Sequence, residues 1–337
     1  MAGVVGLARV RRPAVVLART AAIAVCYYAA GRLGLLRRLV VDGAVFTPIW
    51  PPTGVAVTCL LIFGIRAWPG ITLGALLVGL SVGPPGPDLV GIVAGQTAAP
   101  VCAYLLLRRV GFRTDLGRLR DGLALVFLGA LTAMLISATV GVGLLVTTGK
   151  LDVTRFWVVW LAWWVGDAMG VLIVTPILLM LHRSRRLPGL ARWKEATALL
   201  LASCVLVPVA ALSVMSVLFL VYPLLIWAAL RFRLAGSMPC ALFASVTTTL
   251  AATEGAGPFR GLTDVQVMIK LQAFNGTMAL TALLLSAVIA EQRNTRMSVE
   301  QACKELAEVL EHLTAGDVPP GRTPADGDEQ RPKAGPG

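Results

Sequence analysis

Long apolar runs recur along almost the whole chain and constrain its fold more than any other feature. Hydrophobic residues make up 57% of the sequence and charged residues only 14%. A run of about 20 apolar residues spans the hydrocarbon layer of a bilayer, where backbone amides must be paired within a helix. The runs lie near residues 14–34, 53–66, 68–82, 89–107, 122–147, 156–181, 196–214, 216–230, 236–253 and 265–290. The sequence therefore predicts an all-α, polytopic integral membrane bundle of about 8–10 transmembrane helices.

The basic residues lie between these runs and predict how the chain is oriented. The net charge of +12 would suggest nucleic acid in a soluble protein, but no single domain carries it. With ten crossings and the N-terminus inside, the cytoplasmic segments hold 18 Lys and Arg residues and the opposite side holds 6. Arg19 and Lys270 fall inside runs and are left out of both counts. The positive-inside rule then predicts a bilayer-embedded chain with both termini cytoplasmic and no nucleic-acid partner.

The chain lacks the residue patterns of metal sites, disulfide frameworks and common enzymes. Its six cysteines are scattered singly without a CxxC pair, and it has only two histidines. No phosphate-binding glycine loop, HExxH motif or nucleophile elbow is present. We therefore expect no catalytic residues, no metal and no cofactor, and we do not expect an enzyme.

Three polar residues within the runs are candidate site residues, because polar groups in the hydrocarbon layer are costly. The clearest is Asp167, whose neighbours Gly166, Ala168 and Gly170 are small enough for another helix to pack closely. In hydrocarbon its carboxylate needs a proton, a water molecule or a partner. Asp167 would then have a ligand, ion or signalling role, or it would form a structural hydrogen bond within the bundle. Gln96 and Asn275 are weaker candidates, since either can simply hold two helices together.

Two helix-breaking segments form a second candidate feature. Residues 47–54 hold three prolines and are predicted not to form regular helix, and residues 255–259 are a similar break. Both fall on the predicted outer side. They either roof a common pocket or form ordinary tight turns.

The C-terminal part changes character after Glu291. Apolar residues recur at three- and four-residue spacing in residues 292–314, at Val299, Ala302, Leu306, Val309 and Leu313. This pattern predicts a short amphipathic or coiled-coil stub, which would allow a homodimer through residues 296–313. The predicted domains are a basic cytoplasmic N-terminus (1–13), the membrane domain (14–291), the stub (292–314) and a disordered cytoplasmic tail (315–337).

Five motifs resemble the first type of bacterial membrane-associated sensor domain, the MASE family. They are Pro48–Ala56, Arg66–Gly70, Trp163–Asp167 with Val174–Pro176, Tyr222–Trp227 with Arg231, and Gly257–Phe259. Their order and spacing are similar to the family's over about residues 15–293. The resemblance implies an inner-membrane sensory module, usually joined to cytoplasmic kinase, cyclase, phosphodiesterase, phosphatase or PAS domains. It marks as signature positions Trp50, Pro51, Pro52, Gly54, Trp164, Gly166, Asp167, Arg231, Gly257 and Pro258.

The resulting functional hypothesis is a sensory module that acts on a partner protein in trans, because no output domain is recognised after Glu291. The partner would be a kinase, cyclase or transporter. A small-solute transporter or transporter subunit is the alternative, with Asp167, Gln96 and the broken segments forming its path. A purely structural assembly protein is the third interpretation.

Overall fold

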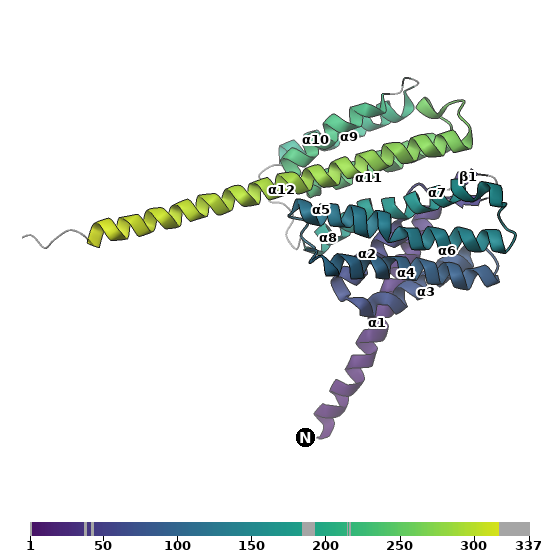
Figure 1. The fold of residues 1–337 in the computed structure, drawn as a ribbon, viewed down its shortest axis with the longest axis horizontal. Coiled ribbons are helices and arrows are strands. Elements are labelled where there is room, and N and C mark those ends of the chain that lie inside the picture. The colour runs from purple at the N-terminus through teal and green to yellow at the C-terminus, as the bar shows by residue number, and fades with distance from the viewer. Residues whose placement is uncertain are drawn as a thin grey trace, which may run out of the picture. The chain divides into compact units, whose positions relative to one another are not determined.

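The computed structural model describes the backbone of residues 2–36, 39–41, 44–183, 193–213, 215 and 217–316 (Figure 1). The N-terminal half contains α1 (Ala2–Leu35), the strands β1 (Leu39–Val41) and β2 (Ala44–Phe46), α2 (Pro51–Phe63), α3 (Trp68–Val82) and α4 (Pro87–Arg109). Next come α5 (Leu119–Ala124), the π-helical segment η2 (Leu125–Thr132), α6 (Met134–Thr147), α7 (Phe156–Met169), the π-helical segment η4 (Gly170–Val174) and α8 (Thr175–Arg183). The last elements are α9 (Trp193–Leu212), α10 (Val221–Phe232), α11 (Leu234–Thr253) and α12 (Asp264–Gly316). Short 3-10 turns lie at Ile65–Ala67 (η1), Val153–Arg155 (η3), Leu218–Leu220 (η6) and Gly257–Phe259 (η7).

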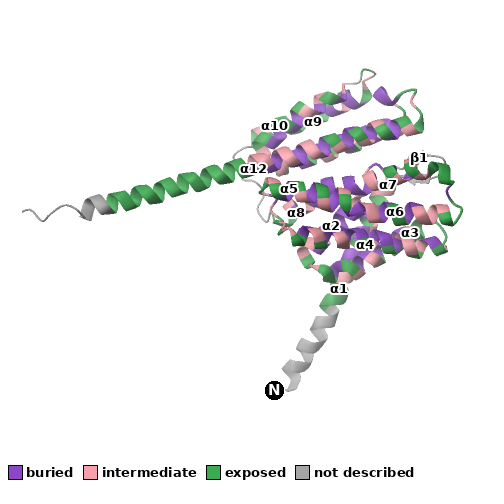
Figure 2. Cartoon of the chain, viewed as in Figure 1, coloured by how far each residue is buried: buried purple, intermediate pink, exposed green. Residues whose placement is uncertain are grey.

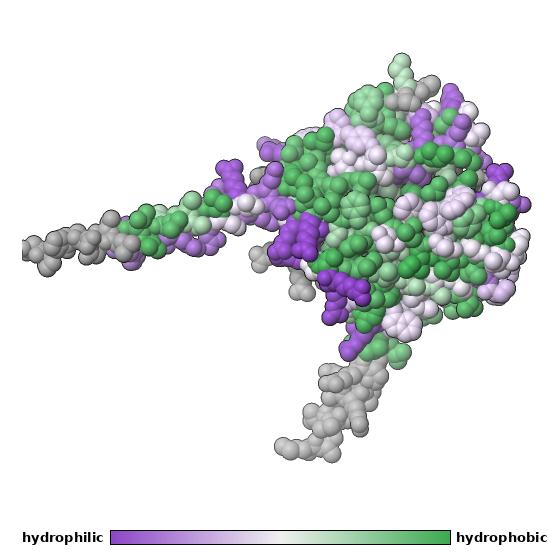
Figure 3. All heavy atoms as spheres, in the orientation of Figure 1, coloured by the Kyte–Doolittle hydropathy of each residue, from purple (hydrophilic) through white to green (hydrophobic). Residues whose placement is uncertain are grey.

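The predicted polytopic helix bundle is confirmed. Among the described residues, seven helical stretches are long and apolar enough to cross a membrane: Ile65–Val82, Pro87–Arg109, Leu119–Thr147, Val153–Arg183, Trp193–Leu212, Leu234–Thr253 and Asp264–His312. Two shorter apolar helices cover Pro51–Phe63 and Leu218–Phe232. Apolar side chains dominate the face of the bundle in Figure 3, as expected where lipid is the solvent.

The start of α2 corrects one prediction. The proline-rich segment 47–54 was expected to be irregular throughout, but the helix begins at Pro51 and includes Pro52 and Gly54. Proline is tolerated in a first turn, because the N–H it lacks would have no partner there within the helix. Only residues 47–50 lie outside regular structure.

A small hairpin precedes α2 and was not predicted. Strands β1 and β2 pair antiparallel, with Leu39 opposite Phe46 and Val41 opposite Ala44. The segment is short and rich in valine, a residue that favours strands. It lies between the predicted runs 14–34 and 53–66, where no secondary structure was predicted.

The helices pack in pairs around a core of small and aliphatic side chains. Helix α1 packs against α3, α4 against α6, and α10 against α11. The largest cluster of buried residues joins α4, η2, η4, α10, α11 and α12. The chain divides into two compact units, Met1–Gln292 and Arg293–Gly337.

Helix α12 crosses the boundary between these units without a break. Its residues up to Ala290 contribute to the core, whereas residues 291–312 are all exposed (Figure 2). Its backbone stays helical to Gly316. The tail from residue 317 onward, predicted to be disordered, lies outside the described residues.

Candidate ligand-binding cavity

The start of α2 packs closely against α7 and η4, two elements more than a hundred residues away in the sequence. The Trp50 N–H donates to the Gly166 carbonyl oxygen at 2.9 Å, and the Thr53 hydroxyl donates to the Asp167 carbonyl oxygen at 3.1 Å. A Cβ added to Gly54 would overlap the Gly170 carbonyl, and one added to Gly170 would overlap the Trp50 carbonyl. These glycines therefore allow the close approach that places Trp50 beside Asp167.

The Asp167 side chain ends a buried chain of hydrogen bonds that joins four helices. Its Oδ2 accepts from the Ser137 hydroxyl of α6 at 2.7 Å. The Ser137 oxygen accepts from Gln96 Nε2 of α4 at 2.9 Å and from Trp163 Nε1 of α7 at 3.2 Å. The Tyr27 hydroxyl of α1 in turn donates to Gln96 Oε1 at 3.2 Å. All these side chains except Trp163, which is half-buried, belong to buried residues.

The direction of this chain is fixed by the chemistry of its members. Trp163 Nε1 and the Gln96 amide nitrogen can only donate, so the Ser137 oxygen accepts from both. The single hydroxyl hydrogen of Ser137 then goes to Asp167. All the hydrogen bonds of the chain therefore point toward the Asp167 carboxylate, which is the final acceptor.

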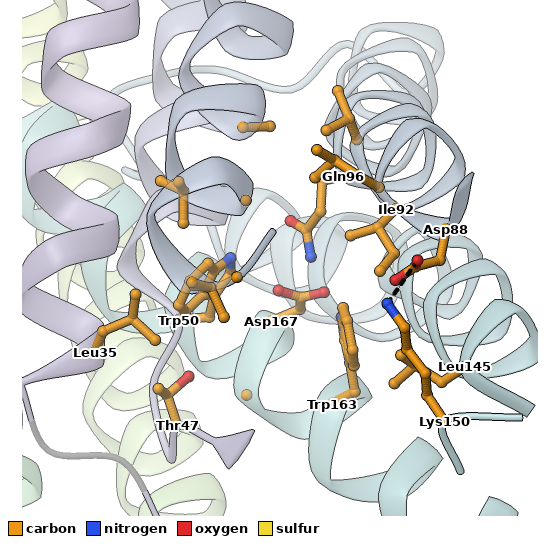
Figure 4. A pocket seen from close by; sticks show the side chains of 18 of the residues that line it. Leu35, Thr47, Trp50, Asp88, Ile92, Gln96, Leu145, Lys150, Trp163 and Asp167 are labelled. Carbon is orange, nitrogen blue, oxygen red and sulfur yellow. Dashed lines mark hydrogen bonds and ion pairs between the residues drawn. The ribbon is translucent and has the colours of Figure 1, made fainter. Parts of the chain in front are cut away.

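Asp167 lines a cavity of about 410 Å³, within the size range of small-molecule sites. Figure 4 shows Trp50 and Trp163 flanking the carboxylate, with Gln96 nearby. Apolar side chains form most of the remaining wall: Leu35, Ala75, Val78, Val82, Leu89, Ile92, Val93, Leu145, Leu151, Val159 and Ala162. The site therefore combines a polar centre with an apolar enclosure.

An ion pair also lines the cavity. Lys150 Nζ, from the connection after α6, lies 2.7 Å from Asp88 Oδ1 in the first turn of α4. The Asp88 side chain is 9% exposed, whereas that of Lys150 is 50% exposed. The pair therefore joins α4 to the 148–152 connection at the more open part of the site.

Five residues of this site were not among the predicted site residues: Tyr27, Asp88, Ser137, Lys150 and Trp163, the last of which was quoted only within the Trp163–Asp167 motif. Ser137 gave a detectable signal, since it is a hydroxyl within the apolar run 122–147. Asp88 carried no prediction, and Lys150 entered only the count of basic residues on the outer side. Their pairing depends on how α4 meets the end of α6, and no local pattern encodes that packing.

The structure places the other predicted site residues away from the cavity. Trp164 donates from Nε1 to the Leu131 carbonyl at 2.8 Å. Arg231, at the end of α10, forms an ion pair with Glu195 of α9. Asn275 is fully buried on α12, and neither polar atom of its side chain has a hydrogen-bond partner among the described residues.

The two helix-breaking segments do not both line this cavity. Thr47 and Trp50 line the cavity, but no residue of 255–259 does. Gly257 and Pro258 are buried in η7, and Gly257 lies against the end of α9 at Ala211 and Leu212. Gly257 has a φ of 56°, a conformation that glycine adopts without strain.

A second set of contacts lies where α12 reaches the end of its buried part. Glu291 Oε2 accepts from the Leu119 N–H at 2.9 Å, at the first residue of α5. This first turn has no side-chain cap from Arg118, so Glu291 supplies the missing acceptor. Nearby, Asp115 pairs with Arg113 at 3.1 Å and with Arg183 of α8 at 3.5 Å.

A bundle of membrane-length helices with a buried carboxylate beside a partly apolar cavity defines a class, the polytopic membrane proteins. The MASE1 family model matches residues 19–293, and the chain belongs to this family of membrane-associated sensor domains. The resemblance drawn from the five motifs is thereby confirmed. No curated protein and no solved structure matches the chain.

Proposed function

We propose that this membrane sensory module detects a small molecule in the Asp167 cavity and passes the signal to a partner protein in trans. The observation that carries the proposal is the hydrogen-bond chain from Tyr27 through Gln96 and Ser137 to Asp167. It connects α1, α4, α6 and α7 at the cavity wall, so a ligand that contacts Asp167 acts on four helices together. The proposal assigns the chain no catalytic step.

The cavity opens toward the outer side of the bacterial inner membrane in this proposal. Helix α4 begins beside the cavity at Asp88 and ends at Arg108 and Arg109, and its 23 residues span about 35 Å. The arginine-rich connections therefore lie at the other end of the bundle, the end that the positive-inside rule assigns to the cytoplasm. We propose that both termini lie on that cytoplasmic side.

The continuous helix 119–147 offers a route from the cavity to the cytoplasmic end. It carries Ser137 in the hydrogen-bond chain, and the N–H of its first residue binds Glu291 of α12. Two π-helical segments, η2 and η4, lie on the helices of Ser137 and Asp167 and contact each other. Such segments frequently occur at functional sites. A ligand that binds two arrangements of these helices with different affinity would shift Glu291 and α12.

The exposed part of α12 is the proposed output surface. Met297, Val299, Leu306, Val309 and Leu310 are each at least half exposed there. An apolar stripe of this kind on an exposed helix suits a partner helix, from a second copy or from a kinase, cyclase or transporter.

The proposal is tested by replacing Asp167 with Asn in the chromosomal gene. Asparagine keeps the size of the side chain and removes its charge, so the protein level in the membrane should stay normal while the downstream response changes. The response is measured as the transcript profile over a range of growth conditions, with a gene deletion as reference. A profile identical to wild type in all conditions where the deletion differs contradicts the proposal.

The transport alternative is separated from sensing by reconstitution. The purified protein in sealed proteoliposomes should move no solute of a mixed small-molecule pool, and internal solutes are measured by mass spectrometry. Specific accumulation that Asp167→Asn abolishes would replace the sensory proposal by transport.

A further inference from the structure

We propose that the cavity takes a small organic ammonium cation with an apolar substituent, and that its nitrogen lies next to the Asp167 carboxylate. The inference rests on the proposed function and names the ligand class of the same site.

The first argument is the charge of Asp167. Among the described residues, no lysine or arginine forms an ion pair with this carboxylate. The basic side chain that lines the cavity, Lys150, is already paired with Asp88. A carboxylate in the apolar interior of a membrane protein needs a proton or a cation. A cationic ligand supplies what the surrounding helices do not.

The second argument is the aromatic lining. Trp50, Trp163 and Tyr27 all border the cavity with Asp167, and Figure 4 shows the two indoles on opposite sides of the carboxylate. Aromatic faces attract ammonium groups, and tryptophan does so most strongly. A carboxylate among aromatic rings is therefore better suited to an organic cation than to a neutral or anionic group.

The third argument is the rest of the wall. Val78, Val82, Ile92, Leu145 and Val159 surround the polar centre and offer no hydrogen bonds from their side chains. A bare metal ion prefers several oxygen ligands at short distance, and no group of three or more Asp, Glu, His or Cys that could hold one occurs among the described residues. The volume of about 410 Å³ holds an apolar substituent of several carbon atoms beside the charged nitrogen.

The experiment compares three probes of similar shape and different charge. Phenethylamine is a cation at pH 7, 2-phenylethanol is neutral and phenylacetate is an anion. Saturable binding to the full-length protein in nanodiscs is measured by equilibrium dialysis, and empty nanodiscs correct for partition into lipid. We expect the cation to bind about tenfold or more tightly than the alcohol, and the anion to bind least.

Three variants assign the preference to the site. Asp167→Asn should reduce the preference for the cation to about threefold or less, and Trp50→Leu should weaken cation binding more than alcohol binding. Asp152→Asn is the matched control, because Asp152 lies outside the cavity lining. Hydrogen bonds from the Thr154 hydroxyl and N–H hold the pKa of Asp152 below its usual value, so this control also removes a charge.

Equal binding of the three probes, a preference for the anion, a cation preference that survives in Asp167→Asn, or no saturable binding of any probe would overturn the inference. Trp50→Leu keeps the test decisive if Asp167→Asn fails to fold. The sensory proposal fails separately, through an unchanged transcript profile in Asp167→Asn cells. A changed profile without cation preference leaves sensing in place and removes the ammonium assignment.

Discussion

At the scale of single residues, Ser137 is the centre of the site rather than the more conspicuous Asp167. Its oxygen accepts two hydrogen bonds and its hydrogen goes to Asp167, so its full capacity is used. Removing the hydroxyl leaves the donors of Gln96 and Trp163 and the carboxylate without this partner in a buried place. A buried polar group that loses its hydrogen-bond partner costs free energy.

We therefore expect Ser137→Ala to lower the free energy of unfolding by about 2–4 kcal/mol. Unfolding of the purified protein in mixed micelles, followed by tryptophan fluorescence, measures the change. Ser81→Ala is the control, since that exposed hydroxyl bonds only to the Val78 carbonyl of its own helix. Equal stability of the two variants would show that the buried chain does not hold the helices together.

At the scale of elements, the contact of α2 with η4 depends on glycines. Gly170 lies against the Trp50 carbonyl and the Thr53 hydroxyl, with no space for a methyl group. Gly170→Ala should force the two elements apart and destabilise the protein by about 1–3 kcal/mol. Gly143→Ala on α6 should be neutral or stabilising by up to about 1 kcal/mol, because its added Cβ meets nothing within 4 Å. Thermal unfolding in detergent compares them, and similar midpoints would argue against close packing at Gly170.

At the same scale, Glu291 of α12 contacts the first turn of helix 119–147. Glu291→Ala removes the acceptor of the Leu119 N–H and should cost about 1 kcal/mol locally. Amide hydrogen exchange should then quicken in residues 119–124 and stay unchanged in α11. Glu254→Gln, at an exposed position after α11, serves as the control. Unchanged protection of residues 119–124 would remove Glu291 from the proposed route.

At the scale of the whole molecule, the distribution of basic residues makes a prediction about sidedness. In a background without the other native cysteines, Cys303 should react with a membrane-impermeant maleimide only after the cells are permeabilised. A Thr148→Cys substitution, in the exposed connection next to the cavity, should react in intact spheroplasts. The opposite pattern would invert the orientation and place the cavity in the cytoplasm.

The sequence by itself was sufficient to predict that most of the chain lies in lipid, that it folds into helices and that it resembles the MASE family. Runs of apolar residues long enough to span a bilayer leave only helices, because every backbone amide must be paired there. The motif order around Trp50 and Asp167 was sufficient to indicate the MASE family, and Asp167 and Gln96 stood out because polar residues are costly in hydrocarbon.

Only the tertiary structure decided which of these residues share a site. Asp167 and Gln96 meet through Ser137, whereas Asn275, Arg231 and Gly257 lie elsewhere. Apolar periodicity shows that a segment is buried, but in a membrane it does not show which neighbour it packs against. That choice is made by close contacts of small residues, such as Gly170 against the start of α2, and these exist only once the helices are assembled.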